Sequence, residues 1–148
     1  MPHNYYTRLL QFAQQFQNYY DRQFLPLLER TGLTMRDIRV LLFLINNPDY
    51  DTAKDITALR GLSKSQVSQA VDLLVAEGML RRTPDQADRR VIHLSITDQG
   101  EPLAREGQTI QDRCSQKLLV GLTPEQQEQF RAYLRTVLDN GIREGAFQ

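Results

Sequence analysis

The sequence predicts a mainly α-helical protein that carries one small two-stranded β-hairpin. Along most of the 148 residues, apolar side chains recur every three or four positions, which is the spacing of one face of a helix. The 8 glycines and 6 prolines are sparse and fall where segments should end. Residues 79–83 are strand-like, and from Ile92 to Ile96 the spacing changes to two, as in a strand with one buried face. We therefore expect helices on both sides of a single hairpin.

The first predicted helix runs from Asn4 to about Arg30. Pro26 should bend or break it near its end, because proline lacks a backbone N–H and clashes with the preceding turn. The chain has 6 Tyr and 6 Phe, and seven of these twelve aromatic residues lie here. This is more apolar surface than the edge helix of a small domain needs, so the segment should pack against a further surface, such as a second subunit.

Three further helices should begin at residues that cap a helix N-terminus. In each case a polar side chain follows three positions later, as a capping box requires. The pairs are Thr34 with Asp37, Thr52 with Asp55, and Ser63 with Gln66. Each helix is followed by residues that stop helices, namely Asn46–Pro48, Gly61 and Gly78.

The hairpin is expected from residues 79–83 and 91–96, with the polar loop 84–90 between them. A long helix should follow, from a cap at Thr97 to about Val120. The last helix should begin at Thr123, because proline occupies the first helical position after it. That helix carries a heptad-like apolar stripe, which consists of Phe130, Tyr133, Leu134, Val137 and Leu138.

Residues 52–60 and 63–77 are joined only by Gly61 and Leu62, which makes them a helix-turn-helix candidate. On a helical wheel the apolar residues of the second helix share one arc, namely Val67, Ala70, Val71, Leu74 and Val75. Opposite this arc lie Asp72, Leu73 and, near the helix start, Ser65, Gln66 and Gln69. Their hydroxyl and amide groups suit the donors and acceptors of base edges in the major groove. Lys64 adds a positive charge beside the helix N-terminus, which itself attracts phosphate.

The hairpin that follows is rich in arginine, with Arg81, Arg82, Arg89 and Arg90 within ten residues. Asp85 and Asp88 oppose these charges, so a simple salt-bridged hairpin stays open as an interpretation. A hairpin with arginines at its tip beside a helix-turn-helix is nevertheless the layout of a winged helix, in which a tip arginine can enter the narrow minor groove. His93, on the second strand, is expected to be a solvated surface group.

Composition argues against several other classes of protein. Lys+Arg and Asp+Glu both number 18, so the chain is no general polycation. One cysteine, Cys114, and two histidines, His3 and His93, are too few for a metal-sensing site, and we expect no metal or cofactor. No apolar run approaches the roughly 20 residues that cross a bilayer, and no secretory signal is visible. We expect a soluble cytoplasmic protein.

No enzymatic activity is expected. The segment Gly-Leu-Ser-Lys-Ser at residues 61–65 resembles a nucleophile elbow only in part, because the final glycine is absent and a helix precedes it where a strand is needed. Neither a Gly-rich phosphate loop nor a dinucleotide fingerprint is visible. A winged helix that binds only protein stays open as the alternative, and salt distinguishes the two, because DNA binding weakens steeply as salt rises.

Residues Ala58–Gly100 resemble the MarR family of winged helix-turn-helix transcriptional regulators. The likeness rests on the Leu-Ser-Lys-Ser start of the second helix, on the Val-Asp and Glu-Gly pairs that follow, and on the Asp-Arg-Arg of the wing; Ile96 stands where leucine is usual. The resemblance implies a homodimer that represses transcription on a pseudo-palindromic duplex. The resemblance also implies that residues 1–148 form one chain unit, with a DNA-binding region at 34–97 and a helical dimerisation region at 1–31 and 98–148.

Carried over residue by residue, the resemblance assigns DNA contacts to Ser63, Lys64, Ser65, Gln66, Ser68, Gln69, Arg89 and Arg90. Asp88 would orient Arg90. Many members have arginine where Gln69 stands, which leaves the target sequence open. Many members also respond to small aromatic ligands, and Phe16, Tyr19 and Tyr20 are candidates for lining such a pocket, against the simpler interpretation that they are core or dimer contacts. Cys114 is expected to be a small packed residue.

Overall fold

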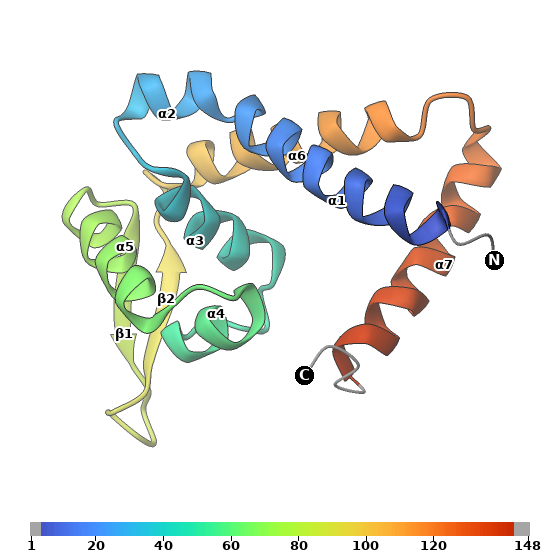
Figure 1. Ribbon diagram of the computed structural model, residues 1–148. Coiled ribbons are helices and arrows are strands. Elements are labelled where there is room, and N and C mark those ends of the chain that lie inside the picture. Colours follow the sequence, from blue (N-terminus) through green and yellow to red (C-terminus); the bar gives the residue numbers. More distant parts are fainter. Residues whose placement is uncertain (1–3, 144–148) are drawn as a thin grey trace. The chain divides into compact units, whose positions relative to one another are not determined.

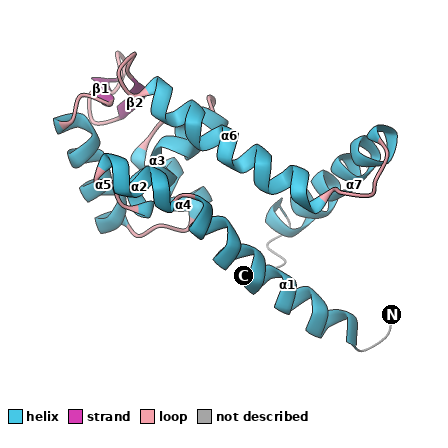
Figure 2. Cartoon of the chain, turned by 90° about the horizontal axis from the view of Figure 1, so that it is seen from above, coloured by secondary structure: helices cyan, strands magenta, loops and turns pink. Residues whose placement is uncertain are grey.

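The computed structural model describes residues 4–143, so His3 and the outermost residues of both expected dimerisation segments lie outside it. Within this range the chain is mainly helical with one antiparallel pair of strands, which confirms the predicted fold class (Figures 1 and 2). The chain divides into two compact units, residues 1–112 and 113–148. None of the described helices combines the length and apolarity needed to cross a bilayer.

The expected break near Pro26 is confirmed. Helix α1 spans Asn4–Gln23 and helix α2 spans Leu25–Thr31, so the interruption falls at Phe24 and Pro26 occupies the first turn of the new helix. Phe24 and Leu27 are buried in the core, whereas no residue of α1 is buried. The aromatic face of α1 therefore stays largely open to solvent in the single chain.

All three predicted capping boxes are present at the helices that follow, namely α3 (Met35–Asn46), α4 (Ala53–Arg60) and α5 (Lys64–Ala76). Gly61 and Gly78 end α4 and α5 in the left-handed backbone region, with φ angles of 72° and 74°, which side chains other than glycine rarely adopt. The core lies between these helices, and its largest fully buried members include Ile38, Leu41, Ile56, Val67 and Leu74.

Strand β1 (Leu80–Pro84) pairs with strand β2 (Ile92–Ile96) in the register Leu80↔Ile96 to Pro84↔Ile92. The hairpin loop extends away from the helices (Figure 1). On its outer edge β2 also meets the segment before α4: Thr52 bridges to His93, and the backbone N–H of Leu94 donates to the carbonyl oxygen of Asp51 at 2.7 Å. The base of the hairpin is therefore attached to the start of the helix-turn-helix.

Helix α6 spans Glu101–Leu118 and helix α7 spans Pro124–Arg143. The start of α6 was expected directly after Thr97, but residues 97–100 form a turn instead. The Thr97 hydroxyl accepts from the backbone N–H of Gly100 at 3.2 Å and donates to the carbonyl oxygen of Gly78 at 2.6 Å. Thr97 thus joins the end of the hairpin to the residue that terminates α5. At α7 the predicted cap is confirmed, with Thr123 bonded to Gln126.

Candidate nucleic-acid interface

The helix-turn-helix presents one polar face and buries the other. Val67, Ala70, Val71 and Leu74 of α5 are buried, as the wheel predicts. The six residues expected to face DNA from this segment are all exposed: Ser63, Lys64, Ser65, Gln66, Ser68 and Gln69. Leu73, placed on the free face by the wheel, is partly buried and packs against the core. The open face of α5 therefore lies mainly along its first two turns and continues to the exposed Asp72.

Four of the six polar side chains on this face have partners within the chain, namely Ser63, Ser65, Gln66 and Gln69. The backbone N–H of Ser63 donates to Oε1 of Gln66 at 3.0 Å, and the N–H of Gln66 donates to Oγ of Ser63 at 3.1 Å. Gln66 thus uses its amide oxygen to cap its own helix, which leaves the amide nitrogen as its outward group. Gln69 donates weakly to Oγ of Ser65, at 3.4 Å, through its own amide nitrogen.

One cation on this face comes from another helix and was missed by the sequence analysis. Nη1 of Arg36, in the first turn of α3, donates to Oε1 of Gln69 at 2.8 Å. The two residues are 33 positions apart in the chain, and no motif links them. Only the packing of α3 across α5 brings the guanidinium onto the polar face.

The hairpin loop is shaped by two aspartates. Oδ2 of Asp85 accepts from the backbone N–H groups of Ala87 and Asp88, both at 2.9 Å, which closes the loop on itself. Oδ1 of Asp88 accepts from the backbone N–H and from Nε of Arg90, both at 3.1 Å. The Arg90 side chain is 92% exposed, and Arg89 beside it is exposed as well. The loop therefore carries two outward arginines, one of them held at its base by Asp88.

His93 lies at the surface as expected, with its side chain 38% exposed, but it also has two carboxylate partners that the sequence did not predict. Its imidazole lies between two carboxylates, with Nδ1 at 2.8 Å from Oδ1 of Asp51 and Nε2 at 2.9 Å from Oδ1 of Asp85. Hydrogen bonds to Asp51 first and to Asp85 second raise the pKa of His93 above its ordinary value. The pKa of Asp85 is lowered, chiefly by the N–H of Asp88 and then by His93. This bridge ties the loop of the hairpin to the start of α4.

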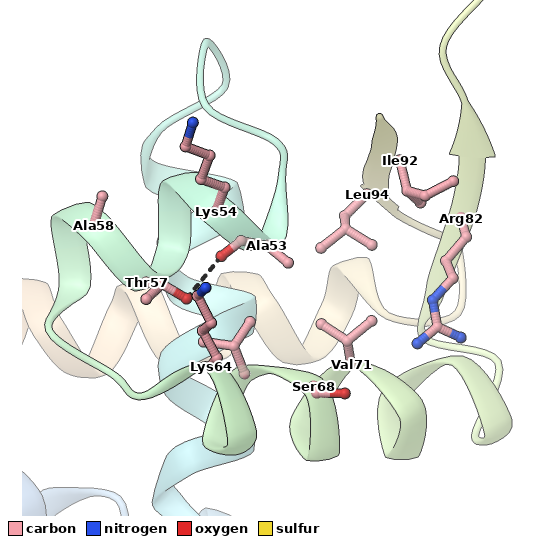
Figure 3. A pocket seen from close by; sticks show the side chains of 11 residues that line it. Ala53, Lys54, Thr57, Ala58, Lys64, Ser68, Val71, Arg82, Ile92 and Leu94 are labelled. Atoms are coloured by element: carbon pink, nitrogen blue, oxygen red, sulfur yellow. Dashed lines mark hydrogen bonds between the residues drawn. The ribbon is translucent and has the colours of Figure 1, made fainter. Parts of the chain in front are cut away.

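A hollow of about 610 Å³ lies between α4, α5 and the hairpin (Figure 3). Its lining combines apolar side chains such as Val67, Val71 and Leu94 with three cationic ones, from Lys54, Lys64 and Arg82. Each cation comes from a different element, namely α4, α5 and β1. Arg82 also forms an ion pair with Asp72 of α5, which links the hairpin to the helix.

The three aromatic residues proposed from the sequence as a ligand pocket lie toward the end of α1. The ring of Phe16 lies between those of Phe12 and Tyr20, with centroids 5.9 and 6.1 Å apart, and Tyr20 contacts the buried ring of Phe24. Tyr20 lines a cavity of about 120 Å³ and accepts a hydrogen bond from Gln111 at 2.8 Å. Tyr19 is partly buried. In α6, Cys114 is buried, as expected of a packed cysteine.

Residues 31–91 match the sequence model of the MarR family. An uncharacterized HTH-type transcriptional regulator from Bacillus subtilis, YwaE, is 30% identical over 87 residues, which is 59% of this chain and about half (51%) of that protein. CouR from Rhodococcus jostii, solved with p-coumaroyl-CoA, superposes with a TM-score of 0.70 at 22% identity, over 90% of this chain and 88% of that one. A mutant of S. aureus MepR bound to an oligodeoxyribonucleotide superposes with a TM-score of 0.55 at 23% identity, over 95% of this chain and 98% of that one.

Proposed function

We propose that this chain is a regulator of the MarR family, which its winged helix-turn-helix region resembles, and that it binds double-stranded DNA of defined sequence as a homodimer and regulates transcription. The observation that carries the proposal is the exposed polar face of α5 beside a hairpin with outward arginines, both within residues 1–112. We assign no enzymatic activity, and we place the protein in the cytoplasm. Occupation of a promoter makes repression the simplest outcome of binding.

In this proposal α5 enters the major groove with its N-terminus leading. Ser63, Lys64 and Ser65 lie at that end, where backbone N–H groups and the Lys64 charge favour phosphate. Further along, Ser68 and Gln69 face the base edges. The hairpin then reaches the neighbouring minor groove, whose narrow A·T-rich stretches attract arginine. Asp88 restrains the Arg90 side chain by accepting a hydrogen bond from its Nε, so less side-chain freedom is lost when Arg90 inserts.

The dimer is proposed from two unpartnered apolar faces. Helix α1 exposes Tyr5, Tyr6, Leu9, Leu10 and Phe12, and helix α7 exposes Phe130, Tyr133, Leu134, Val137 and Leu138. Monomeric proteins rarely leave such contiguous apolar faces open to solvent. A two-fold symmetric dimer would present two recognition helices about one helical turn apart, roughly 34–36 Å, and would read a pseudo-palindromic site.

We further propose that a small molecule releases the DNA. CouR, a protein of this fold, has been solved bound to p-coumaroyl-CoA, which supports a ligand site in such a protein. The candidates for contacting such a ligand are Phe16, Tyr19 and Tyr20. The cavity beside Tyr20 holds about 120 Å³, well below the roughly 300–1,000 Å³ of ordinary ligand pockets. A ligand would therefore enter there only if the surrounding helices move apart, and that movement would change the spacing of the recognition helices.

Selection of bound duplexes from a random pool at two salt concentrations tests the function. We expect a symmetric consensus and an affinity that falls steeply with salt, by a slope of about 0.9 per phosphate neutralised. Arg90→Ala should weaken binding roughly tenfold or more, because hydrogen bonds to charged groups contribute about 1.5–3 kcal/mol. Arg105→Ala, which removes an exposed arginine of α6, is the matched control.

The two variants also separate the DNA-binding proposal from its alternative. Neither should change the free energy of unfolding by more than about 0.5 kcal/mol, since both arginines are exposed. If no duplex is enriched at low salt, the proposal fails and the protein-interaction module is left as the alternative. If duplexes are enriched but Arg90→Ala binds like the control, the hairpin does not enter the groove.

A further inference from the structure

We propose that Arg36 and Gln69 act as one DNA-reading unit that presents only hydrogen-bond donors and so recognises an acceptor pair of the duplex. This inference rests on the proposed function and adds a contact residue from α3, outside the helix-turn-helix. The guanidinium of Arg36 reaches the polar face of α5 through the 2.8 Å bond from its Nη1 to Oε1 of Gln69. Its side chain is 28% exposed, so part of it still meets solvent.

The guanidinium is held in place from behind. Nε and Nη2 of Arg36 donate to Oδ1 of Asp37 at 3.0 and 2.9 Å. Asp37 is fully buried, and its Oδ2 accepts from the backbone N–H and the hydroxyl of Thr34 at the start of α3. The carboxylate therefore cannot move without breaking the cap of α3. Because Arg36 is already ordered, binding DNA costs it little conformational entropy.

The donor count of Arg36 leaves groups for an outside acceptor. A guanidinium has five N–H groups. The two bonds to Asp37 and the one to Gln69 use three of them, which leaves one N–H on Nη1 and one on Nη2. The two remaining N–H groups lie on different terminal nitrogens of the guanidinium, and such a pair of nitrogens can bind two neighbouring acceptors.

The same bond changes what Gln69 offers. A glutamine that reads adenine uses its amide oxygen as an acceptor and its nitrogen as a donor. Here the oxygen already faces the Arg36 guanidinium, and the amide nitrogen makes only a long contact with Ser65. The pair thus turns N–H donors outward. Guanine N7 and O6, or two phosphate oxygens, provide the matching pair of acceptors, whereas the major-groove edge of adenine places a donor next to its acceptor.

The test compares the selected sites and salt dependence of the full chain with those of Arg36→Ala, Arg36→Lys and Gln69→Ala. Arg105→Ala serves as the control for loss of an exposed arginine. If a guanine is read, Arg36→Ala relaxes the preference for G at one position of each half-site, with a loss of roughly 5- to 150-fold on the wild-type site. If phosphate is bound, affinity falls equally on all sequences and the salt slope drops by about 0.9 per protomer.

The variants also show whether the two residues act together. Gln69→Ala should alter the same position as Arg36→Ala, and the double variant should lose less than the sum of the two single effects. Should Arg36→Ala fail to fold because Asp37 loses its partner, Arg36→Lys keeps a charge beside Asp37 and removes the pair of terminal nitrogens, so it gives the same comparison. A folded Arg36 variant that keeps wild-type preference and salt slope overturns the inference. A wild-type chain that binds no duplex overturns the proposed function instead.

Discussion

The proposal that the apolar stripe of α7 forms the dimer interface is best tested by placing carboxylates in the stripe. In the single chain Leu134 and Leu138 are 40% and 53% exposed. Complete burial of a leucine side chain stabilises by about 1.5–3 kcal/mol, so covering this exposed half contributes about 1 kcal/mol for each residue. A symmetric dimer buries both residues twice, and the double variant Leu134→Asp/Leu138→Asp should therefore lose about 4 kcal/mol of association free energy. That loss raises the dimer dissociation constant by roughly 1,000-fold.

Sedimentation equilibrium over a range of protein concentrations measures this constant directly. The matched control is Thr136→Asp, which adds the same charge to an exposed position on the opposite side of the helix. The control should associate like the wild type, and both proteins should keep the same helical circular dichroism. If the double variant forms dimers as tightly as the control does, the stripe is not the dimer interface and the assignment of α7 is refuted. Binding to a duplex with one half-site distinguishes loss of the dimer from loss of the reading face.

Two other predictions concern the winged helix itself. Because hydrogen bonds to Asp51 and Asp85 raise the pKa of His93 in the folded state, the bridge stabilises fully below the ordinary histidine pKa of 6.5 and loses strength as pH rises through the raised value. The difference in unfolding free energy between wild type and His93→Gln, measured in urea, should thus shrink from pH 5.5 to pH 9; a constant difference would contradict the bridge. Gly100→Ala should cost about 1–3 kcal/mol, because the added methyl group overlaps the backbone carbonyl of Met79, whereas Gly107→Ala should cost less, because its nearest contacts are side-chain atoms of Leu42 rather than backbone. Equal stabilities of the two alanine variants would show that the turn before α6 is not tightly packed.

Much of the fold follows from the sequence because its determinants are local. A capping box joins residues three positions apart, so Thr34, Thr52 and Ser63 could be identified as helix starts from spacing alone, and all three are confirmed. The buried arc of α5 likewise follows from the 3.6-residue period of a helix, which fixes the side of the helix on which each side chain lies. The start of α6 is the local exception, since Thr97 bonds to Gly78 and residues 97–100 form a turn.

The partners of the site residues depend instead on contacts between distant parts of the chain. His93 meets Asp51 across 42 positions, and Arg36 meets Gln69 across 33, and neither spacing has a periodicity that a sequence pattern could reveal. The residue types show that all four side chains are polar, but residue type alone does not say whether a polar side chain faces water or a neighbouring side chain. That outcome was decided when α3 packed against α5 and the hairpin paired with the segment before α4, because only then did the bonding geometry of these side chains exist.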